Sequence, residues 1–169
     1  MRAAAWVQDS PVGPLYVRTS DAGLRLLDLH GAGDRPVPGD RPVDEVADAL
    51  RAYFDGALDA VEEMDVDLSG RTPFSVAVLG ALRRVPAKSL TSYGRLAAAA
   101  GRPGAGRAVG QAVGANPVPI VVPCHRVVAG DGSIGGFSGG LDTKRWLLAH
   151  EGHSGWQIGA VAAPVRQPE

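Results

Sequence analysis

The single cysteine of the chain, Cys124, is followed directly by His125. A thiol reacts as its thiolate, and an imidazole that takes the thiol proton favours that form. Adjacent side chains need not touch, but a tight turn or one bridging water could link this pair. We therefore expect Cys124 to be a nucleophile with a depressed pKa. On the cysteine count alone, the alternative is a buried and inert small hydrophobic residue.

Prolines shape the segment that precedes Cys124. Pro117 and Pro119 forbid a helix from continuing through it. The apolar residues 120–122 form a short run that we expect to be buried, so that Cys124 lies at the end of a rigid element. A third group should orient the imidazole of His125, and spacing alone does not select one.

Charge is distributed unevenly, although the net charge is only −1. Residues 1–67 hold 14 acidic and 6 basic side chains, whereas residues 68–130 hold 8 basic and no acidic ones. Such a segment is typical of a surface that binds a polyanion. The alternative is a solvated face that pairs with the acidic half of the chain. The complete absence of acids favours phosphate binding by this set: Arg71, Arg83, Arg84, Lys88, Arg95, Arg102, Arg107 and Arg126.

Residues 1–68 are predicted to form a small α/β domain that carries no chemistry. Apolar positions at helical spacing predict a helix over 43–54, which Gly56 ends. The acidic segment 59–67 is a candidate for a further strand of the sheet. Turn sequences separate three apolar runs that predict strands at 3–7, 15–18 and 24–29.

A second domain is predicted over 69–155, followed by a tail at 156–169. Thr72 is a suitable N-cap, with Pro73 at the first helical position of a helix that reaches about residue 84. Two further helices, predicted at 93–100 and 105–114 around a glycine-containing turn, resemble a helix-turn-helix.

The predicted helix 105–114 consists largely of glycine and alanine. Glycine is a poor helix former, so a helix this bare has another purpose. One purpose is entry into a DNA minor groove, which is only about 6 Å wide. Tight packing against another helix is an equal alternative.

The motif Pro123-Cys124-His125-Arg126-Val127 resembles the acceptor signature of the O6-alkylguanine-DNA alkyltransferases, also called methylated-DNA–protein-cysteine methyltransferases. The resemblance is strong over residues 69–152 and looser at 10–15 and 53–56. Further segments match the family in order and spacing: Ser92-Tyr93-Gly94-x-Leu96-Ala97, Arg107-Ala108-Val109-Gly110, Asn116-Pro117-x-Pro119 and Leu147-Leu148-Ala149-x-Glu151-Gly152.

The resemblance implies a role for each matching residue. Cys124 would accept the alkyl group, His125 would take its proton, through water, and Glu151 would orient His125. Tyr93 would donate a hydrogen bond to the flipped guanine, and Arg107 would fill the space that the base leaves. Asn116 would brace the turn that holds Cys124. DNA would also contact Ser75 and Ala108, while Val113, Val127, Phe137 and Ser138 would complete the alkylguanine pocket.

For the whole protein, the resemblance implies repair by direct reversal. The alkyl group of O6-alkylguanine in double-stranded DNA would move irreversibly to Cys124, once per molecule, and O4-alkylthymine is a second candidate substrate. It implies a ribonuclease-H-like N-terminal domain and a mainly α-helical, winged-helix-like C-terminal domain. We expect no cofactor, and we expect no metal because no ligand cluster is visible in the sequence. We expect a monomer. The chemistry agrees, because a lesion inside a duplex must be rotated out and the departing base needs hydrogen-bond donors.

Each of these residues has a simpler alternative role. Tyr93 could be a core aromatic, Arg107 a phosphate ligand, Glu151 a surface charge at a helix end and Asn116 a turn residue. His30, His150 and His153 are assigned no function. The chain departs from the family pattern at Lys88, Leu79 and Phe137, where glycine, tryptophan and tyrosine are usual. These departures bear on efficiency more than on identity.

Two other functions remain open from the sequence. A non-catalytic lesion-binding protein would resemble this family but lack the acceptor cysteine, whereas Cys124 is present. A cysteine–histidine hydrolase unrelated to DNA would not need the acid-free basic segment. There is no run of eighteen apolar residues and no apolar stretch of a signal peptide at the start. We therefore expect a soluble, cytoplasmic protein with no membrane partner.

Overall fold

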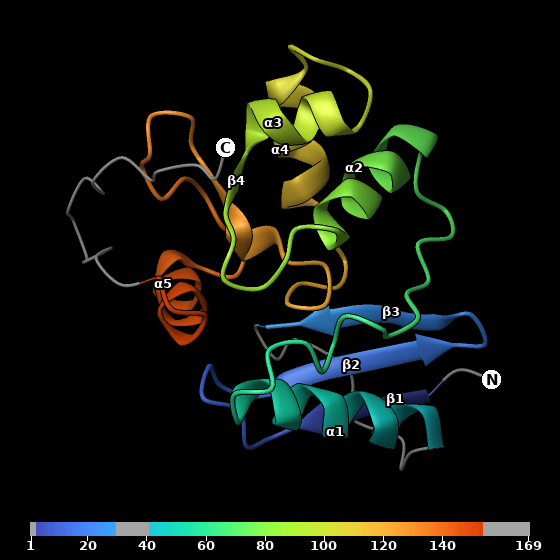
Figure 1. Ribbon diagram of the computed structural model, residues 1–169. Helices are drawn as coiled ribbons and strands as arrows, with labels where there is room; N and C mark the ends of the chain where they lie inside the picture. Colours follow the sequence, from blue (N-terminus) through green and yellow to red (C-terminus); the bar gives the residue numbers. More distant parts are fainter. Residues whose placement is uncertain (1–2, 30–40, 154–169) are drawn as a thin grey trace. The chain divides into compact units, whose positions relative to one another are not determined.

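The computed structural model describes residues 3–29 and 41–153 of the 169-residue chain (Figure 1). It forms two compact units, Met1–Gly70 with Pro117–Val121, and Arg71–Asn116 with Val122–Glu169. The sequence-based domains 1–68 and 69–155 are continuous and contain no equivalent of the return of 117–121 to the first unit. The tail expected at 156–169 lies outside the described residues.

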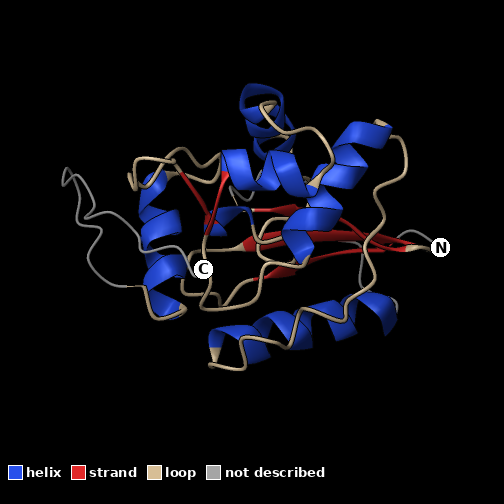
Figure 2. Cartoon of the chain, turned by 45° about the horizontal axis from the view of Figure 1, so that its top comes forward, coloured by secondary structure: helices blue, strands red, loops and turns tan. Residues whose placement is uncertain are grey.

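The first unit is a small antiparallel sheet covered by one helix. Its strands lie in the order β1 (Ala3–Val7), β2 (Leu15–Ser20) and β3 (Gly23–Asp28), so the three predicted strands are confirmed within two residues. Helix α1 (Arg41–Phe54) packs on β1 and β2 and lies along one face of the sheet (Figure 2). The apolar spacing predicted this helix correctly, because five of its positions are buried: Val43, Val46, Ala47, Leu50 and Tyr53.

The acidic segment 59–67 does not form the further strand that the sequence suggested. It consists of turns and one isolated parallel bridge between Leu24 and Val66. Gly23 makes the approach possible, since a Cβ there would lie 2.4 Å from the carbonyl oxygen of Asp65. The chain then turns away because the Asp67 carboxylate binds the Ser20 hydroxyl, the Arg25 guanidinium and the Ser69 N–H.

Three mutually packed helices form the first part of the second unit: α2 (Pro73–Arg83), α3 (Tyr93–Ala99) and α4 (Gly106–Gly114). The predicted cap at Thr72 is confirmed, and Ser92 caps the next helix in the same way. Thr72 accepts a hydrogen bond of 3.2 Å from the Ser75 N–H at the start of α2. Ser92 accepts one of 3.3 Å from the Arg95 N–H at the start of α3. The first turns of both helices are therefore satisfied by side chains that local sequence specifies.

A two-stranded parallel sheet brings the start of α3 close to Cys124. Strand β4 (Thr91–Ser92) leads directly into α3 and pairs with β5 (Val127–Val128), with Thr91 opposite Val127. Strand β5 follows the short 3-10 helix η1 (Cys124–Arg126). The pairing therefore places Tyr93 and Cys124 on neighbouring segments.

The last helix, α5 (Leu141–His150), packs against η1. The sequence suggested a helix end at Glu151 but not where such a helix begins. The residue that caps its C-terminus is Glu151, which is fully buried. Helix α5 thus delivers a carboxylate to the Cys124 turn. Within residues 3–29 and 41–153, no helix combines the length and apolar character needed to cross a bilayer.

Candidate active site

The second unit contains a cavity of about 310 Å³ next to Cys124. Its wall brings together four residues that the family resemblance assigned to a pocket, Tyr93, Val113, Phe137 and Ser138, with Cys124 itself. Asn116 and Val127 are not part of the wall. The full lining is Tyr93, Gly110, Val113, Gly114, Cys124, Gly136, Phe137 and Ser138.

The thiol of Cys124 is buried, with 4% of the residue exposed. Burial raises the pKa of this thiol to about 11, and this effect exceeds the opposing influence of the Asn116 side chain and the Lys144 charge. The depressed pKa expected from the neighbouring histidine is therefore wrong for the resting protein. Desolvation disfavours the charged thiolate more strongly than the nearby dipoles and cation favour it.

His125 and Glu151 form a buried pair. Nε2 of His125 lies 2.8 Å from Oε1 of Glu151, and both side chains are inaccessible to solvent. A carboxylate accepts hydrogen bonds, so Nε2 carries the proton and Nδ1 carries the lone pair. Nδ1 is buried and has no hydrogen-bond partner among the described residues. Burial also lowers the pKa of His125, which keeps Nδ1 available as a base.

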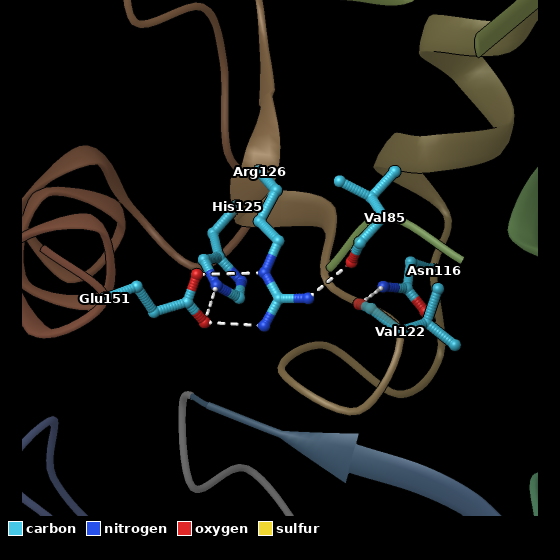
Figure 3. A network of polar contacts seen from close by, with 6 residues as sticks. All are labelled: Val85, Asn116, Val122, His125, Arg126 and Glu151. Atoms are coloured by element: carbon cyan, nitrogen blue, oxygen red, sulfur yellow. Dashed lines mark hydrogen bonds and ion pairs between the residues drawn. The ribbon is translucent and has the colours of Figure 1, made fainter. Parts of the chain in front are cut away.

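Arg126 contacts both oxygens of the same carboxylate, as Figure 3 shows. Its Nε donates to Oε2 of Glu151 at 2.9 Å and its Nη2 donates to Oε1 at 2.8 Å. Burial would raise the pKa of Glu151, but the hydrogen bonds from Arg126 and His125 outweigh it and hold that pKa well below its ordinary value. Glu151 is therefore an ionised buried carboxylate and not a surface charge.

Arg126 was counted with the bases of a phosphate-binding surface, and the structure corrects that assignment. Only 2% of the residue is exposed, and its guanidinium is used internally. Sequence reasoning missed this role because charged residues are rarely fully buried unless they are paired. The signal that could have revealed it is the position of Arg126 directly after Cys124 and His125.

Asn116 closes the loop that precedes Cys124. Its Nδ2 donates a hydrogen bond of 2.8 Å to the Val122 carbonyl (Figure 3). The Asn116 side chain is also hydrogen-bonded to the Cys124 thiol. These contacts hold both ends of residues 117–121, where Ile120 adopts a left-handed φ of 74° that is rare for a β-branched residue.

Lys144 is a second buried cation that sequence reasoning missed. It lies on α5 and donates to the carbonyls of Val127, Ile134 and Gly136. Burial lowers its pKa to about 8. Nothing in the sequence around Lys144 indicated that its side chain points into the protein.

The residues assigned to DNA lie on exposed helix surfaces. Arg107 and Ala108 are exposed on α4, and the same helix contributes Gly110 and Val113 to the cavity wall. Ser75 is half-exposed in the first turn of α2. Helix α4 therefore presents an arginine to solvent next to the cavity that contains Cys124.

Comparison with known proteins gives consistent matches. Residues 73–153 match the family model of the 6-O-methylguanine DNA methyltransferase DNA-binding domain. The chain is 41% identical over 160 residues to the methylated-DNA–protein-cysteine methyltransferase of Salmonella typhimurium, in a match that covers 85% of this chain and 92% of that protein.

Two solved structures from Mycobacterium tuberculosis are also similar. Its O6-methylguanine methyltransferase matches with a TM-score of 0.75 and 36% identity, over 89% of this chain and 93% of that one. Its OGT in complex with DNA matches with a TM-score of 0.72 and 35% identity, over 89% and 92%. Because likeness in sequence and in fold extends over nearly the whole of these relatives, the chain belongs to the methylated-DNA–protein-cysteine methyltransferase family.

Proposed function

We propose that this protein repairs O6-alkylguanine in double-stranded DNA by transferring the alkyl group to the sulfur of Cys124. The observation that carries this proposal is the arrangement of Cys124 on a cavity wall, followed by a histidine whose Nε2 faces a buried carboxylate. The Nδ1 of that histidine has no partner within the described part of the chain. This combines a nucleophile, a base and a group that orients the base.

The proton must leave Cys124 as the alkyl group arrives. With a thiol pKa of about 11, the thiolate is only about one part in ten thousand at pH 7. His125 therefore acts as a general base and takes the thiol proton at Nδ1, directly or through one water. The sulfur then forms a bond to the alkyl carbon while the bond from that carbon to guanine O6 breaks.

The departing guanine carries the electron pair of the broken bond and must be stabilised. Tyr93 borders the cavity, and its hydroxyl is hydrogen-bonded with the Gly136 backbone. A hydroxyl held in this way can donate to the leaving base and return a proton to it. The product on Cys124 is a thioether, which has no easy leaving group, so each molecule reacts once.

DNA is the proposed partner because the similar Mycobacterium tuberculosis OGT is described in complex with DNA. Exposed Arg107 on α4 would enter the minor groove and occupy the space left by the flipped base. A ribonuclease-H-like first unit and a winged-helix-like second unit are part of this proposal, as are the monomeric state and the contacts of Ser75 and Ala108 with DNA.

The test is reaction with a duplex that contains one O6-methylguanine, followed by intact-mass measurement. We expect the mass gain of one methyl group on Cys124 and no further repair when substrate is in large excess. Binding without a mass gain would indicate a lesion-binding protein, and continued turnover would indicate a hydrolase. Either result would overturn the proposal.

Variants distinguish a specific role of His125 as the base from a general effect of replacing a histidine. Cys124→Ser should abolish transfer but retain DNA binding. His125→Asn should slow transfer strongly, whereas the control His150→Asn, on the ring stacked against Trp146, should react like the wild type. Equal rates for both histidine variants would exclude His125 as the base.

A further inference from the structure

Arg126 donates hydrogen bonds to both carboxylate oxygens of Glu151. Nε contacts Oε2 and Nη2 contacts Oε1, at 2.9 and 2.8 Å, in the side-on fork that matches a guanidinium to a carboxylate. The third nitrogen, Nη1, donates to the Val85 carbonyl at 2.7 Å, just beyond the end of α2. The guanidinium is therefore held from two sides and cannot rotate away from Glu151 (Figure 3).

Oε1 of Glu151 is shared between Arg126 and His125. It lies 2.8 Å from Nη2 of Arg126 and 2.8 Å from Nε2 of His125. The fork fixes the plane of the carboxylate and so determines the direction in which Oε1 meets the imidazole. Arg126 therefore acts on His125 without touching it at the ring nitrogen that reacts.

The charge of Arg126 has a second consequence. An isolated carboxylate buried beside an imidazole would favour the imidazolium, in which Nδ1 is protonated and cannot act as a base. Paired with Arg126, Glu151 presents His125 with a nearly neutral group. The imidazole then keeps its orienting hydrogen bond but gains little incentive to bind a second proton.

We propose that Arg126 is a positioning residue of this site, which aims Glu151 at His125 and offsets its charge so that Nδ1 stays unprotonated and ready to accept the Cys124 proton. The inference rests on the proposed alkyl transfer for its catalytic meaning. Its electrostatic content concerns the unreacted protein and can be measured without DNA.

Other charged groups act on the same histidine and must be held constant. Lys144 on α5 disfavours the imidazolium, as Arg126 does, and Cys124 is uncharged at rest. The charges of Glu151 and Arg126 also act on the pKa of His153, which lies just after α5. The end of α2 contributes the uncharged Val85 carbonyl. Arg126 is distinguished from these groups because it binds the carboxylate that orients the imidazole.

The experiment is a nitrogen-15 NMR titration of histidine-labelled protein, with the His125 signal assigned from His125→Asn. In the wild type we expect Nε2 protonated, Nδ1 unprotonated and a titration midpoint below 6.5. In Arg126→Met the midpoint should rise by about one pH unit or more, because the extra proton goes to imidazole, which is more basic than a carboxylate. Arg126→Lys, which keeps the charge, should stay close to the wild type.

The rate of alkyl transfer provides the functional readout. As pH falls from 8, the rate should decrease when His125 becomes protonated, and this decrease should begin about one pH unit higher in Arg126→Met than in the wild type. Arg51→Met, at an exposed arginine of α1, is the matched control and should not change the profile. A purely structural role for Arg126 would lower rate and stability but leave the pH midpoint in place, which would overturn the proposal.

A double variant covers the case in which Arg126→Met does not fold. Glu151→Gln leaves Arg126 as an unpaired cation near His125, and Arg126→Met/Glu151→Gln removes it. The His125 midpoint should therefore be higher in the double variant than in Glu151→Gln. An unchanged midpoint would exclude an electrostatic effect of Arg126. Failure of the wild type to take up a methyl group would overturn the proposed function and leave the titration result valid.

Discussion

Nζ of Lys144 donates a hydrogen bond of 2.7 Å to the carbonyl oxygen of Val127, three residues after Cys124. The same ammonium group binds the carbonyls of Ile134 and Gly136 in the loop that lines the cavity. One buried cation thus joins the segment after the nucleophile to the loop that carries Phe137. Lys144 therefore helps to hold the cavity loop against the segment that follows Cys124.

Lys144→Met should destabilise the protein and slow alkyl transfer. The substitution preserves side-chain length but removes the ammonium donor from three carbonyls. An unsatisfied buried acceptor costs about 1–3 kcal/mol, so the free energy of unfolding should fall by roughly 3 kcal/mol. Urea melts and single-turnover kinetics measure both effects. In the urea melts, the exposed control Lys88→Met should unfold like the wild type, and an equally mild effect at Lys144 would contradict the prediction.

Gly135→Ala should be more damaging than the neighbouring Gly136→Ala. Gly135 has a φ of +71°, and a Cβ there would lie 3.4 Å from the Tyr93 hydroxyl and 3.6 Å from Nζ of Lys144. A left-handed alanine costs about 1–2 kcal/mol. At Gly136 an added Cβ meets nothing within 4 Å. Thermal melts of both variants test this, and equal melting temperatures would contradict it.

Modification of Cys124 by iodoacetamide should follow its raised pKa. Since burial raises that pKa to about 11, the thiolate fraction grows as pH increases. The rate in folded protein should rise about tenfold per pH unit from pH 7 to 10, without a plateau near 8.5. When the same protein is unfolded in urea, the modification rate should level off above a pH of about 8.5. A plateau in folded protein below pH 8 would instead support a depressed thiol pKa.

Arg107→Ala should impair repair of duplex DNA more than reaction with free O6-alkylguanine. Arg107 is exposed on α4, and no hydrogen bond or ion pair of its guanidinium is found within the described part of the chain. Its loss should therefore spare the fold. The salt dependence of duplex binding should also become weaker, because one of the positive charges proposed to lie against the DNA is removed. Arg18→Ala, on β2 of the first unit, is the control. Equal losses on both substrates would argue against base flipping.

Phe137→Ala should lower the rate of alkyl transfer far more than Phe137→Tyr changes that rate. Phe137 lines the cavity, and stacking of a base on an aromatic ring contributes about 1–3 kcal/mol. A neutral hydrogen bond contributes only about 0.5–1.5 kcal/mol net. Phe137→Tyr should thus alter the single-turnover rate by about tenfold at most. If folded Phe137→Ala reacts at the wild-type rate, the ring does not form part of the guanine site.

Local patterns predicted the elements that local interactions determine. The helix over 43–54 follows from its apolar spacing, and α2 follows from Thr72 and Pro73, because caps and periodicity act within a few residues. The pairing of Thr91 with Val127 could not be predicted, since it joins residues far apart in the sequence. The turns at 59–67 replaced an expected strand because Asp67 binds side chains of another segment.

The electrostatics of the site were less predictable than its residue types. A cysteine followed by histidine suggested a depressed thiol pKa, but only the structure reveals that Cys124 is buried. Burial reverses the direction in which the pKa moves. For the same reason Arg126 was taken for a surface base, because a sequence shows charges without the partners that make their burial tolerable.

The return of Pro117–Val121 to the first unit affects the order in which the chain can fold during synthesis. The Leu27 N–H donates to the Pro117 carbonyl at 2.8 Å, and Val118, Ile120 and Val121 are buried. The N-terminal unit therefore cannot complete its packing as it leaves the ribosome, because its last piece is translated only after α4. A fragment starting at Arg71 would contain these aliphatic side chains but not the N-terminal unit against which they pack. We therefore expect this fragment to aggregate unless the first 70 residues are supplied in trans.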